Sequence, residues 1–249
     1  MNLKKRLQSG DQLLGTLLSL PSPEIAEMMS QVGFDWLFID LEHGPHGFME
    51  LQRMLQAMRS DCGALVRVPE VSESNIKKVL DIGAEGIIVP KVNSAEEAER
   101  IVSYAKYPTQ GVRGVGAARA QGYGLSFQEY IEKANESTMV VIQIEHFEGV
   151  NQIHNILSVE GIDVVFIGPY DLSASLGLAG QVDHPQVREA IEKVEQACQE
   201  VSMPMGYFGT TPESVRPYQQ KKGYQLITCG TDSGGLIAQA QGILKGLRG

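Results

Sequence analysis

The chain has 249 residues, of which 43% are hydrophobic, a composition that can bury a substantial core and argues against disorder. Its 21 Lys and Arg residues against 30 Asp and Glu residues leave a net charge of -9, so neither nucleic acid nor an anionic membrane is an expected partner. No apolar run has the length of a membrane span or of a signal-peptide core, so we expect a soluble, cytoplasmic protein.

Eight short apolar runs recur along the chain, bounded by Gly, Pro or Asp. Their nearly continuous apolar character is typical of strands that are covered on both faces. In chain order the expected strands are Leu13–Leu20, Trp36–Glu42, Ala64–Pro69, Gly86–Val92, Met139–Glu145, Asp163–Gly168, Pro204–Phe208 and Gln225–Cys229.

Stretches with helical spacing of apolar residues lie between these runs, and helix-start signals such as Ser22-Pro23 and Thr211-Pro212 open several of them. Regular alternation of strand and helix predicts a parallel sheet. Eight such units in one chain of this length predict a single (β/α)8 TIM barrel over residues 1–249. An open, doubly wound sheet is the alternative, but no GxGxxG follows the first strand. The expected helices are Pro23–Val32, Phe48–Arg59, Ser72–Ile82, Ala95–Tyr104, Phe127–Ala134, Val150–Leu157, Pro185–Val201 and Pro212–Lys221.

The stretch from Tyr107 to Gly124 departs from this alternation, because it is rich in Gly and Arg and has no apolar periodicity. A loop of this length inside a compact domain is usually functional or mobile. We expect residues 111–124 to lie over the mouth of a barrel, either its own or that of a neighbouring subunit. Arg113 and Arg119 would then meet a carboxylate or hydroxyl of a substrate.

Polar side chains gather where four of the expected strands end. Active-site groups of a (β/α)8 barrel lie at the C-terminal ends of its strands, so we expect these side chains to share one site. They are Asp40, Glu42 and His43 at the second strand, Arg67 in the third, Gln143 and Glu145 in the fifth, and Asp171 after the sixth.

These residue types together predict enolate chemistry. Glu145 and Asp171 are hard oxygen ligands that suit Mg2+ or Mn2+, and a 2-oxo acid such as pyruvate can chelate such an ion. Arg67 can face the oxyanion that develops when a proton leaves C3. Removal of that proton needs a base, for which His43 is the candidate, and backbone N–H groups around Tyr170 and Asp171 could bind the carboxylate.

Several segments in matching order and spacing resemble the HpcH/HpaI aldolase family. They are FIDLEHGPH, RVPE, LDIGAEGIIVPKVNSAEEA, YPTQGVRGVGAARA, VIQIE and GIDVVFIGPYDLSASLG. The resemblance extends from Gly15 to the eighth strand. It implies a class II aldolase acting on pyruvate and an aldehyde, with Mg2+, Mn2+ or Co2+, on a barrel of the phosphoenolpyruvate/pyruvate-domain type. It further implies a hexamer in which the last helix is exchanged between subunits, and the apolar segment Leu236–Leu247 is suited to such docking.

The resemblance also implies roles for individual residues. It assigns His43 as the catalytic histidine, Arg67 as the group that stabilises the enolate, Glu145 and Asp171 as the metal ligands, and Gln143 with the backbone of Tyr170 and Asp171 as substrate contacts. An aspartate that raises the basicity of the histidine matches Asp81. The position of Asp81 ahead of the fourth strand predicts, however, that it reaches such a histidine only across a subunit contact or through rearranged topology. Asp40 and Glu42 are the local alternatives for orienting His43.

Alternative chemistries depend on a few residues. Lys91 ends the fourth run and could form a Schiff base, which would make the chain a metal-free class I aldolase. We favour the metal, because a Schiff-base site needs no carboxylate pair. His46 is a second candidate base, farther from the strand end. His146 follows Glu145 and is expected to point away from it, and Tyr170 is expected to crowd the carboxylate pocket.

Two further alternatives concern the reaction itself. The same enolate could add to a 2-oxo acid, as in a citrate-synthase-like enzyme, or arise by decarboxylation of oxaloacetate. A non-catalytic oxo-acid sensor on the same scaffold is the alternative from another class. A sensor needs no base beside the enolate position, so His43 argues against it.

Overall fold

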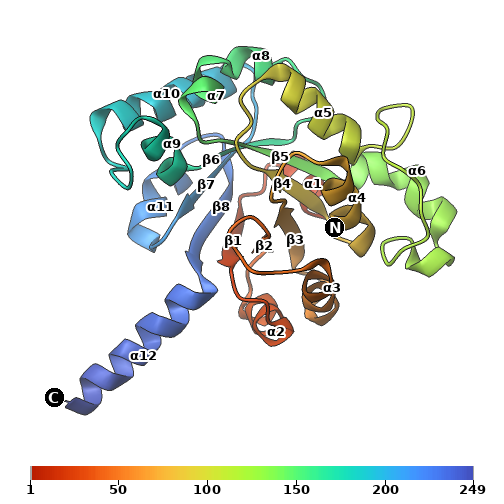
Figure 1. Cartoon of the computed structure of the whole chain (residues 1–249). Coiled ribbons are helices and arrows are strands. Elements are labelled where there is room, and N and C mark those ends of the chain that lie inside the picture. The colour runs from red at the N-terminus through yellow and green to blue at the C-terminus, as the bar shows by residue number, and fades with distance from the viewer. Residues whose placement is uncertain (1, 249) are drawn as a thin grey trace.

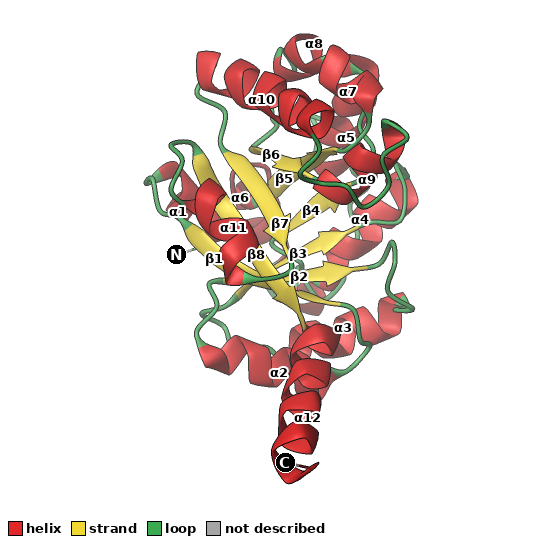
Figure 2. Ribbon diagram, turned by 90° about the vertical axis from the view of Figure 1, so that its left-hand side faces the viewer, coloured by secondary structure: helices red, strands yellow, loops and turns green. Residues whose placement is uncertain are grey.

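Eight parallel strands form a closed barrel in which each strand pairs with the next in the chain and β8 pairs with β1 (Figures 1 and 2). The computed structural model describes residues 2–248. The predicted (β/α)8 barrel is confirmed, with one strand at each of the eight apolar runs. The strands are β1 Leu13–Leu18, β2 Trp36–Asp40, β3 Gly63–Arg67, β4 Gly86–Val89, β5 Met139–Ile144, β6 Val164–Ile167, β7 Met205–Gly209 and β8 Tyr224–Thr231.

Helices surround the barrel, and most begin at the predicted start signals. Ser22, Ser94 and Thr211 each accept a hydrogen bond from the backbone two or three residues into the following helix, which satisfies an otherwise unpaired N–H. The helices are α1 Leu3–Gln8, α2 Pro23–Val32, α3 Phe48–Ala57, α4 Glu73–Ile82, α5 Ala95–Ala105, α6 Phe127–Ser137, α7 Phe147–Asn151, α8 Ile153–Leu157, α9 Pro169–Ser175, α10 Pro185–Glu200, α11 Pro212–Gln219 and α12 Asp232–Arg248.

Three details differ from the expected helices. The N-terminal helix α1 is additional, and it buries only Leu3 and Leu7, too few apolar residues to show helical spacing. The expected helix Val150–Leu157 is two short helices, α7 and α8, which meet at Gln152. Helix α9 opens directly after β6, at Pro169.

The period of two along each strand divides the core into two layers. Trp36 and Phe38 face the barrel interior, whereas Leu37 and Ile39 pack under the helices. The Phe38 and Phe166 rings meet edge to face inside the barrel, with centroids 5.8 Å apart. Fully burying a side chain of this size contributes about 1.5–3 kcal/mol. The same alternation turns Arg67, two residues after Leu65, to the interior, and its guanidinium carbon lies 5.2 Å from the centre of the Phe38 ring.

Helix α12 extends away from the barrel, as Figure 1 shows at the C-terminus. Its N-terminal end contacts β1, β8 and the loop after β1, where Asp232 accepts hydrogen bonds from Ser19 and Leu20. Large apolar side chains along it are exposed, namely Leu236, Ile237, Ile243, Leu244 and Leu247. Among residues 2–248, no helix combines the length and apolar character required to cross a membrane.

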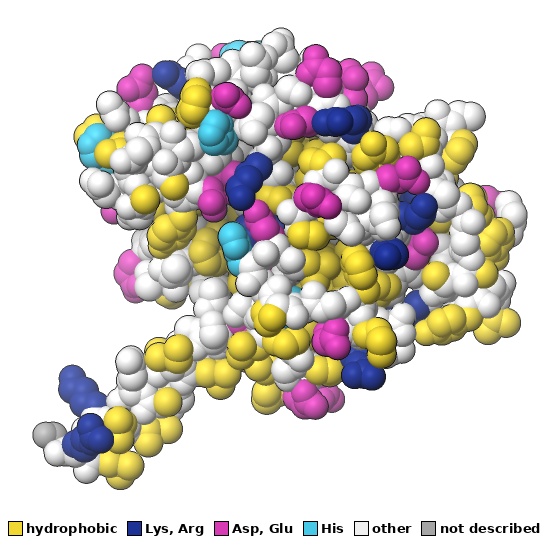
Figure 3. All heavy atoms as spheres, in the orientation of Figure 1, with side chains coloured by type: hydrophobic (Ala, Val, Ile, Leu, Met, Phe, Trp, Pro, Cys, Tyr) yellow, Lys and Arg dark blue, Asp and Glu magenta, His cyan; other side chains and the backbone are white. Residues whose placement is uncertain are grey.

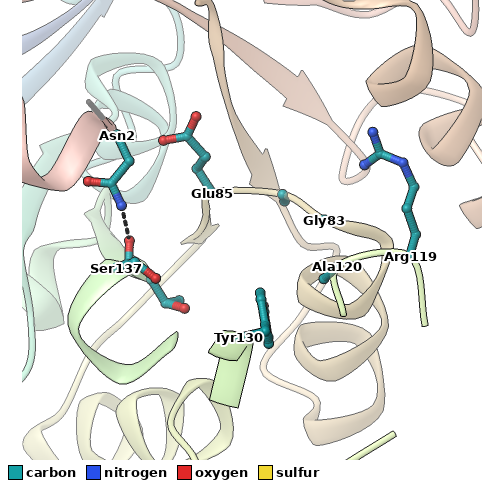
Figure 4. A pocket seen from close by; sticks show the side chains of 9 residues that line it. Asn2, Gly83, Glu85, Arg119, Ala120, Tyr130 and Ser137 are labelled. Atoms are coloured by element: carbon teal, nitrogen blue, oxygen red, sulfur yellow. Dashed lines mark hydrogen bonds between the residues drawn. The ribbon is translucent and has the colours of Figure 1, made fainter. Parts of the chain in front are cut away.

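The Gly/Arg segment, residues 107–124, does not lie over the mouth of its own barrel, so this part of the prediction is wrong. Its Ala120 N–H donates to Asp81 O, and Arg119 donates to Ile82 O at 2.9 Å and to Leu55 O at 3.2 Å. The turn after α4 leads into the start of β4, so these contacts hold the segment near the N-terminal ends of the strands. A cavity of about 360 Å3 lies there, and Figure 4 shows Arg119 on one side of it and Asn2 on the other.

Arg113 has no access to a substrate of its own subunit, and that expectation is also wrong. Its side chain is fully buried, with the guanidinium carbon 4.5 Å from the centre of the Tyr107 ring and 5.7 Å from that of Tyr130. Nη2 donates to Asp81 Oδ1 at 2.7 Å. The arginine therefore packs inside the segment as a structural cation.

Candidate active site

The C-terminal ends of the strands enclose a cavity of about 230 Å3 in which the predicted polar residues meet. Figure 2 shows the strands running toward the side of the barrel away from the N-terminus. Figure 3 shows Lys or Arg, Asp or Glu, and His side chains close together in the middle of one face. The cavity is lined by Leu17, Phe38, His43, Arg67, Gln143, Glu145, Phe166, Gly168, Pro169, Tyr170, Asp171 and Phe208.

Arg67, the last residue of β3, is held by acidic partners from the neighbouring strand and loop. Its Nε and Nη2 donate to the two oxygens of Asp40 at 2.9 and 2.7 Å. Nη1 donates to Gln143 Oε1 at 3.4 Å and lies 3.2 Å from Glu42 Oε2. Burial opposes the charge, but these carboxylates raise the pKa of Arg67 above its usual value, so it stays a cation. The forked contact with Asp40 fixes the direction of the guanidinium.

Glu145 lies at the centre of the cavity wall and is 2% exposed. Its Oε2 accepts from Gln143 Nε2 and its Oε1 from the Lys91 backbone N–H, both at 2.9 Å. Gly168 lies so close that a β-carbon there would overlap with Glu145 Oε2. Burial raises the pKa of Glu145 to about 7, and the negative charge of Asp171 adds to the rise.

This pair of carboxylates fits a divalent cation. Asp171, in the first turn of α9, lines the same cavity as Glu145, and their mutual repulsion is part of what raises the pKa of Glu145. A bound divalent cation would remove both the repulsion and the unfavourable burial of charge. Among residues 2–248, no three His, Cys, Asp or Glu side chains form a metal-holding cluster. The pair would therefore leave further coordination positions to water and substrate.

His43 follows β2 at the rim of the cavity, with its side chain 61% exposed. Its Nε2 lies 3.9 Å from Glu42 Oε2, and its backbone N–H donates to Asp40 Oδ1 at 3.3 Å. Of the two local candidates for orienting His43, Glu42 therefore lies beside the imidazole, and Asp40 accepts a hydrogen bond from the His43 backbone. The second candidate base, His46, has its Nε2 3.3 Å from Leu18 O.

Asp81 lies on α4, outside this cavity. Its Oδ1 accepts from Arg113 and, at 3.4 Å, from Gln121 Nε2. Within one subunit the structure does not bring Asp81 to His43, as its position ahead of β4 predicted. A role for Asp81 beside a histidine requires a second subunit.

Lys91, the second residue after β4, contacts the same acidic group as His43. Its Nζ lies 3.2 Å from Glu42 Oε1, and this hydrogen bond raises the pKa of Lys91 above its usual value. A lysine that forms a Schiff base needs a lowered pKa, because only the neutral amine attacks a carbonyl. The environment of Lys91 therefore argues against the class I alternative.

Glu42 is the residue whose importance the sequence understated. It contacts Arg67, His43 and Lys91 from three different segments, and its side chain is only 10% exposed. The sequence did contain an indication of this role, because Glu42 follows Asp40 by two residues. If β2 continued, both side chains would face the same side of the strand. The structure ends β2 at Asp40, so Glu42 reaches the site from the loop.

Aromatic side chains also line the cavity. Tyr170 is 42% exposed, and its ring centroid is 6.5 Å from that of Phe208. Crowding of the carboxylate pocket by Tyr170 stays a prediction. His146 caps α7 and contacts Phe147, turned away from Glu145 as the strand alternation predicted.

Known proteins resemble this chain over nearly its whole length. The model of the HpcH/HpaI aldolase/citrate lyase family matches residues 14–238. A hydroxypyruvate/pyruvate aldolase from Pseudomonas aeruginosa is 38% identical over 232 residues, 92% of this chain and 86% of that protein. The structure of an HpcH/HpaI aldolase/citrate lyase family protein from Burkholderia cenocepacia superposes with a TM-score of 0.95 at 32% identity, covering 99% of both chains. The citrate synthase SbnG gives a TM-score of 0.89 at 32% identity, over 99% of this chain and 97% of that one.

Proposed function

The chain belongs to the HpcH/HpaI aldolase/citrate lyase family, and from that premise we propose a class II aldolase reaction between pyruvate, or a close analogue, and an aldehyde. The observation that carries the proposal is the meeting of Glu145, Asp171 and Arg67 in one cavity. Two carboxylates would hold a cation, and a fixed guanidinium beside them suits an oxyanion.

Glu145 and Asp171 are the proposed metal ligands, with Mg2+, Mn2+ or Co2+ as the ion. When bound, such an ion supplies Lewis-acid stabilisation of negative charge on a 2-oxo acid. Gln143 supports the arrangement, because its amide donates to Glu145 while its carbonyl accepts from Arg67. The backbone at Tyr170 and Asp171 is the proposed contact for the substrate carboxylate.

In the proposed reaction, His43 accepts a proton from C3 of pyruvate, and Arg67 donates to the enolate oxygen that forms. C3 then bonds to the aldehyde carbon, and the aldehyde oxygen takes up the proton that His43 accepted. Cleavage follows the same steps in reverse. Glu42 positions the imidazole and stabilises its protonated form. Phe38 and Phe166 close the floor of the cavity and keep water away from the enolate.

The likeness to citrate synthase SbnG favours one alternative, in which the same enolate adds to a 2-oxo acid. The two reactions share every step up to the enolate and differ in the electrophile. A non-catalytic sensor would neither form the enolate nor add it to an electrophile.

We also propose a homo-oligomer of six subunits with α12 exchanged between neighbours. The exposed apolar residues Leu236, Ile237, Ile243, Leu244 and Leu247 along α12 support this assembly. The size of the particle in solution, measured by light scattering, tests it. A fully active monomer would remove the exchange of α12.

Exchange of the C3 protons of pyruvate in D2O, followed by NMR, tests the first half of the reaction. We expect metal-dependent exchange without any aldehyde. A panel of aldehydes and 2-oxo acids, screened with pyruvate and metal, then identifies the electrophile. Absence of exchange with each metal would favour the sensor.

A further inference from the structure

The backbone of Lys91 is held in an unusual conformation at the mouth of the barrel. Its φ of 54° lies in the left-handed region that favours glycine. Its N–H donates to Glu145 at 2.9 Å. A glycine would adopt this conformation at a lower steric cost and would keep the same hydrogen bond. The presence of a lysine instead indicates that its side chain has a function of its own.

The charges of the side chains around the cavity indicate what Lys91 contributes there. The acidic side chains at the mouth are Asp40, Glu42, Glu145 and Asp171, and the basic ones in contact with them are Arg67 and Lys91. Four carboxylates and two cations leave two negative charges, which the proposed divalent ion would neutralise. Pyruvate then brings another negative charge. Without Lys91, the mouth would be negative before either substrate arrived and would repel a second anion.

The two cations differ in what they offer to a ligand. Arg67 is 9% exposed, and three of its five N–H groups donate to Asp40 and Gln143, so its remaining donors can serve only a ligand inside the cavity, such as the proposed enolate. Lys91 has a side chain that is 56% exposed, and within residues 2–248 its Nζ contacts one carboxylate oxygen, on Glu42. An ammonium group carries three N–H donors, so two remain for a ligand that approaches from solvent.

We propose that Lys91 is a specificity-determining residue that selects acceptor aldehydes bearing a carboxylate over neutral aldehydes of the same length. This inference rests on the proposed aldolase function and names its acceptor class. The carboxylate of the acceptor accepts a charge-assisted hydrogen bond from Lys91 Nζ, while the aldehyde carbon faces C3 of pyruvate. Glu42 holds the ammonium at the rim, which lowers the entropy lost on binding.

The test compares matched acceptors in the wild-type enzyme and in Lys91→Met, which has a side chain of similar length without the charge. The pairs are glyoxylate with acetaldehyde and succinic semialdehyde with butanal. We expect the wild type to prefer the carboxylated member of at least one pair in kcat/KM. Lys91→Met should reduce that preference by about ten- to a hundredfold, and Lys91→Arg should retain most of it.

A matched control and a separate readout keep the outcomes distinct. Lys133→Met, on the exposed face of α6, should leave the preference unchanged. Exchange of the C3 protons of pyruvate is measured in parallel. If Lys91→Met loses exchange as strongly as turnover of the carboxylated acceptor, Lys91 acts through Glu42 on the base, and the selectivity role is overturned. An unchanged preference with normal exchange also overturns it. A wild-type enzyme without exchange would overturn the aldolase function and this inference together.

Discussion

Two buried arginines, Arg67 and Arg113, occupy very different surroundings. Arg67 ends β3 and is surrounded by carboxylates and an amide at the edge of an open cavity. Arg113 lies in the Gly/Arg segment between two tyrosine rings, and its Nε and Nη1 have no hydrogen-bond partner among residues 2–248. Both were predicted to meet substrate. The difference shows that a position at the end of a barrel strand predicts a place in the cavity better than a Gly-rich context does.

The partners of each arginine explain why. A guanidinium at a strand end shares the cavity with the residues of other strand ends, so its charge is available to a substrate. Aromatic rings stabilise Arg113 through their negative faces and at the same time shield it from solvent. The mouth of the barrel is thus expected to control activity, and the Gly/Arg segment to control stability. The following experiments test whether the two regions differ in this way.

Removing the metal should have the largest effect. Dialysis against EDTA should abolish turnover and pyruvate proton exchange, because Glu145 and Asp171 alone only add negative charge beside the enolate. Addition of Mg2+, Mn2+ or Co2+ should restore both. Full activity in EDTA, together with a pyruvate adduct trapped on Lys91 by borohydride, would contradict the metal-dependent reaction.

His43→Ala should lower turnover by about two to four orders of magnitude, because His43 is the proposed acceptor of the C3 proton. Binding of Mn2+, followed by its electron paramagnetic resonance signal, should persist. His46→Ala is the matched control and should retain most activity. If His43→Ala exchanges pyruvate protons at nearly the wild-type rate, the base is another residue, and His46 becomes the better candidate.

Arg67→Ala should lower turnover and proton exchange together by about two to three orders of magnitude, since the enolate loses its charge partner. The variant should also lose stability, because Asp40 would remain buried without its partner. Urea denaturation separates the two effects. Arg67→Lys keeps the charge but not the forked contact, and activity intermediate between wild type and Arg67→Ala is expected. Unchanged exchange in a folded Arg67→Ala protein would remove the contrast with Arg113.

Metal affinity should depend on pH through Glu145. With a pKa of about 7 in the metal-free protein, raised by burial, this carboxyl is increasingly protonated as the pH falls below 7. A cation must displace that proton, so the dissociation constant for Mn2+ should rise about tenfold per unit of pH below 7 and level off above it. Calorimetry in two buffers of different ionisation enthalpy measures the proton released. Binding without proton release at pH 6 would contradict the raised pKa.

Arg113→Met should have the smallest effect on the chemistry and a clear effect on folding. Loss of the contacts with two tyrosines and Asp81 should reduce the free energy of unfolding by about 2–3 kcal/mol. Turnover per folded molecule should stay within about an order of magnitude of the wild type. Arg100→Met, on the exposed side of α5, is the control and should change stability by less than about 0.5 kcal/mol. A loss of turnover as large as that of Arg67→Ala would place Arg113 in the reaction, across a subunit contact.

The barrel and the positions of its polar residues could be predicted because both follow from local patterns. Apolar runs mark the strands, and the period of two determines that Arg67, Gln143 and Glu145 face the same interior. The path of the Gly/Arg segment could not be predicted this way. It depends on contacts with backbone groups far away in the chain, such as Leu55 O and Ile82 O, which no local pattern encodes. The contact between Lys91 and Glu42 has the same origin, since it joins loops from two different strands.

The close approach of Gly168 to Glu145 has a practical consequence for redesign of this enzyme. Any side chain at position 168 would displace a proposed metal ligand, so mutational libraries aimed at new products should leave it unchanged. Phe208 lines the same cavity and is not among the proposed metal ligands or pyruvate contacts. Varying Phe208 should widen or narrow the room for the acceptor and leave the proposed contacts to pyruvate in place. The protein thus separates the residues that must be kept from those open to substitution within a single small cavity.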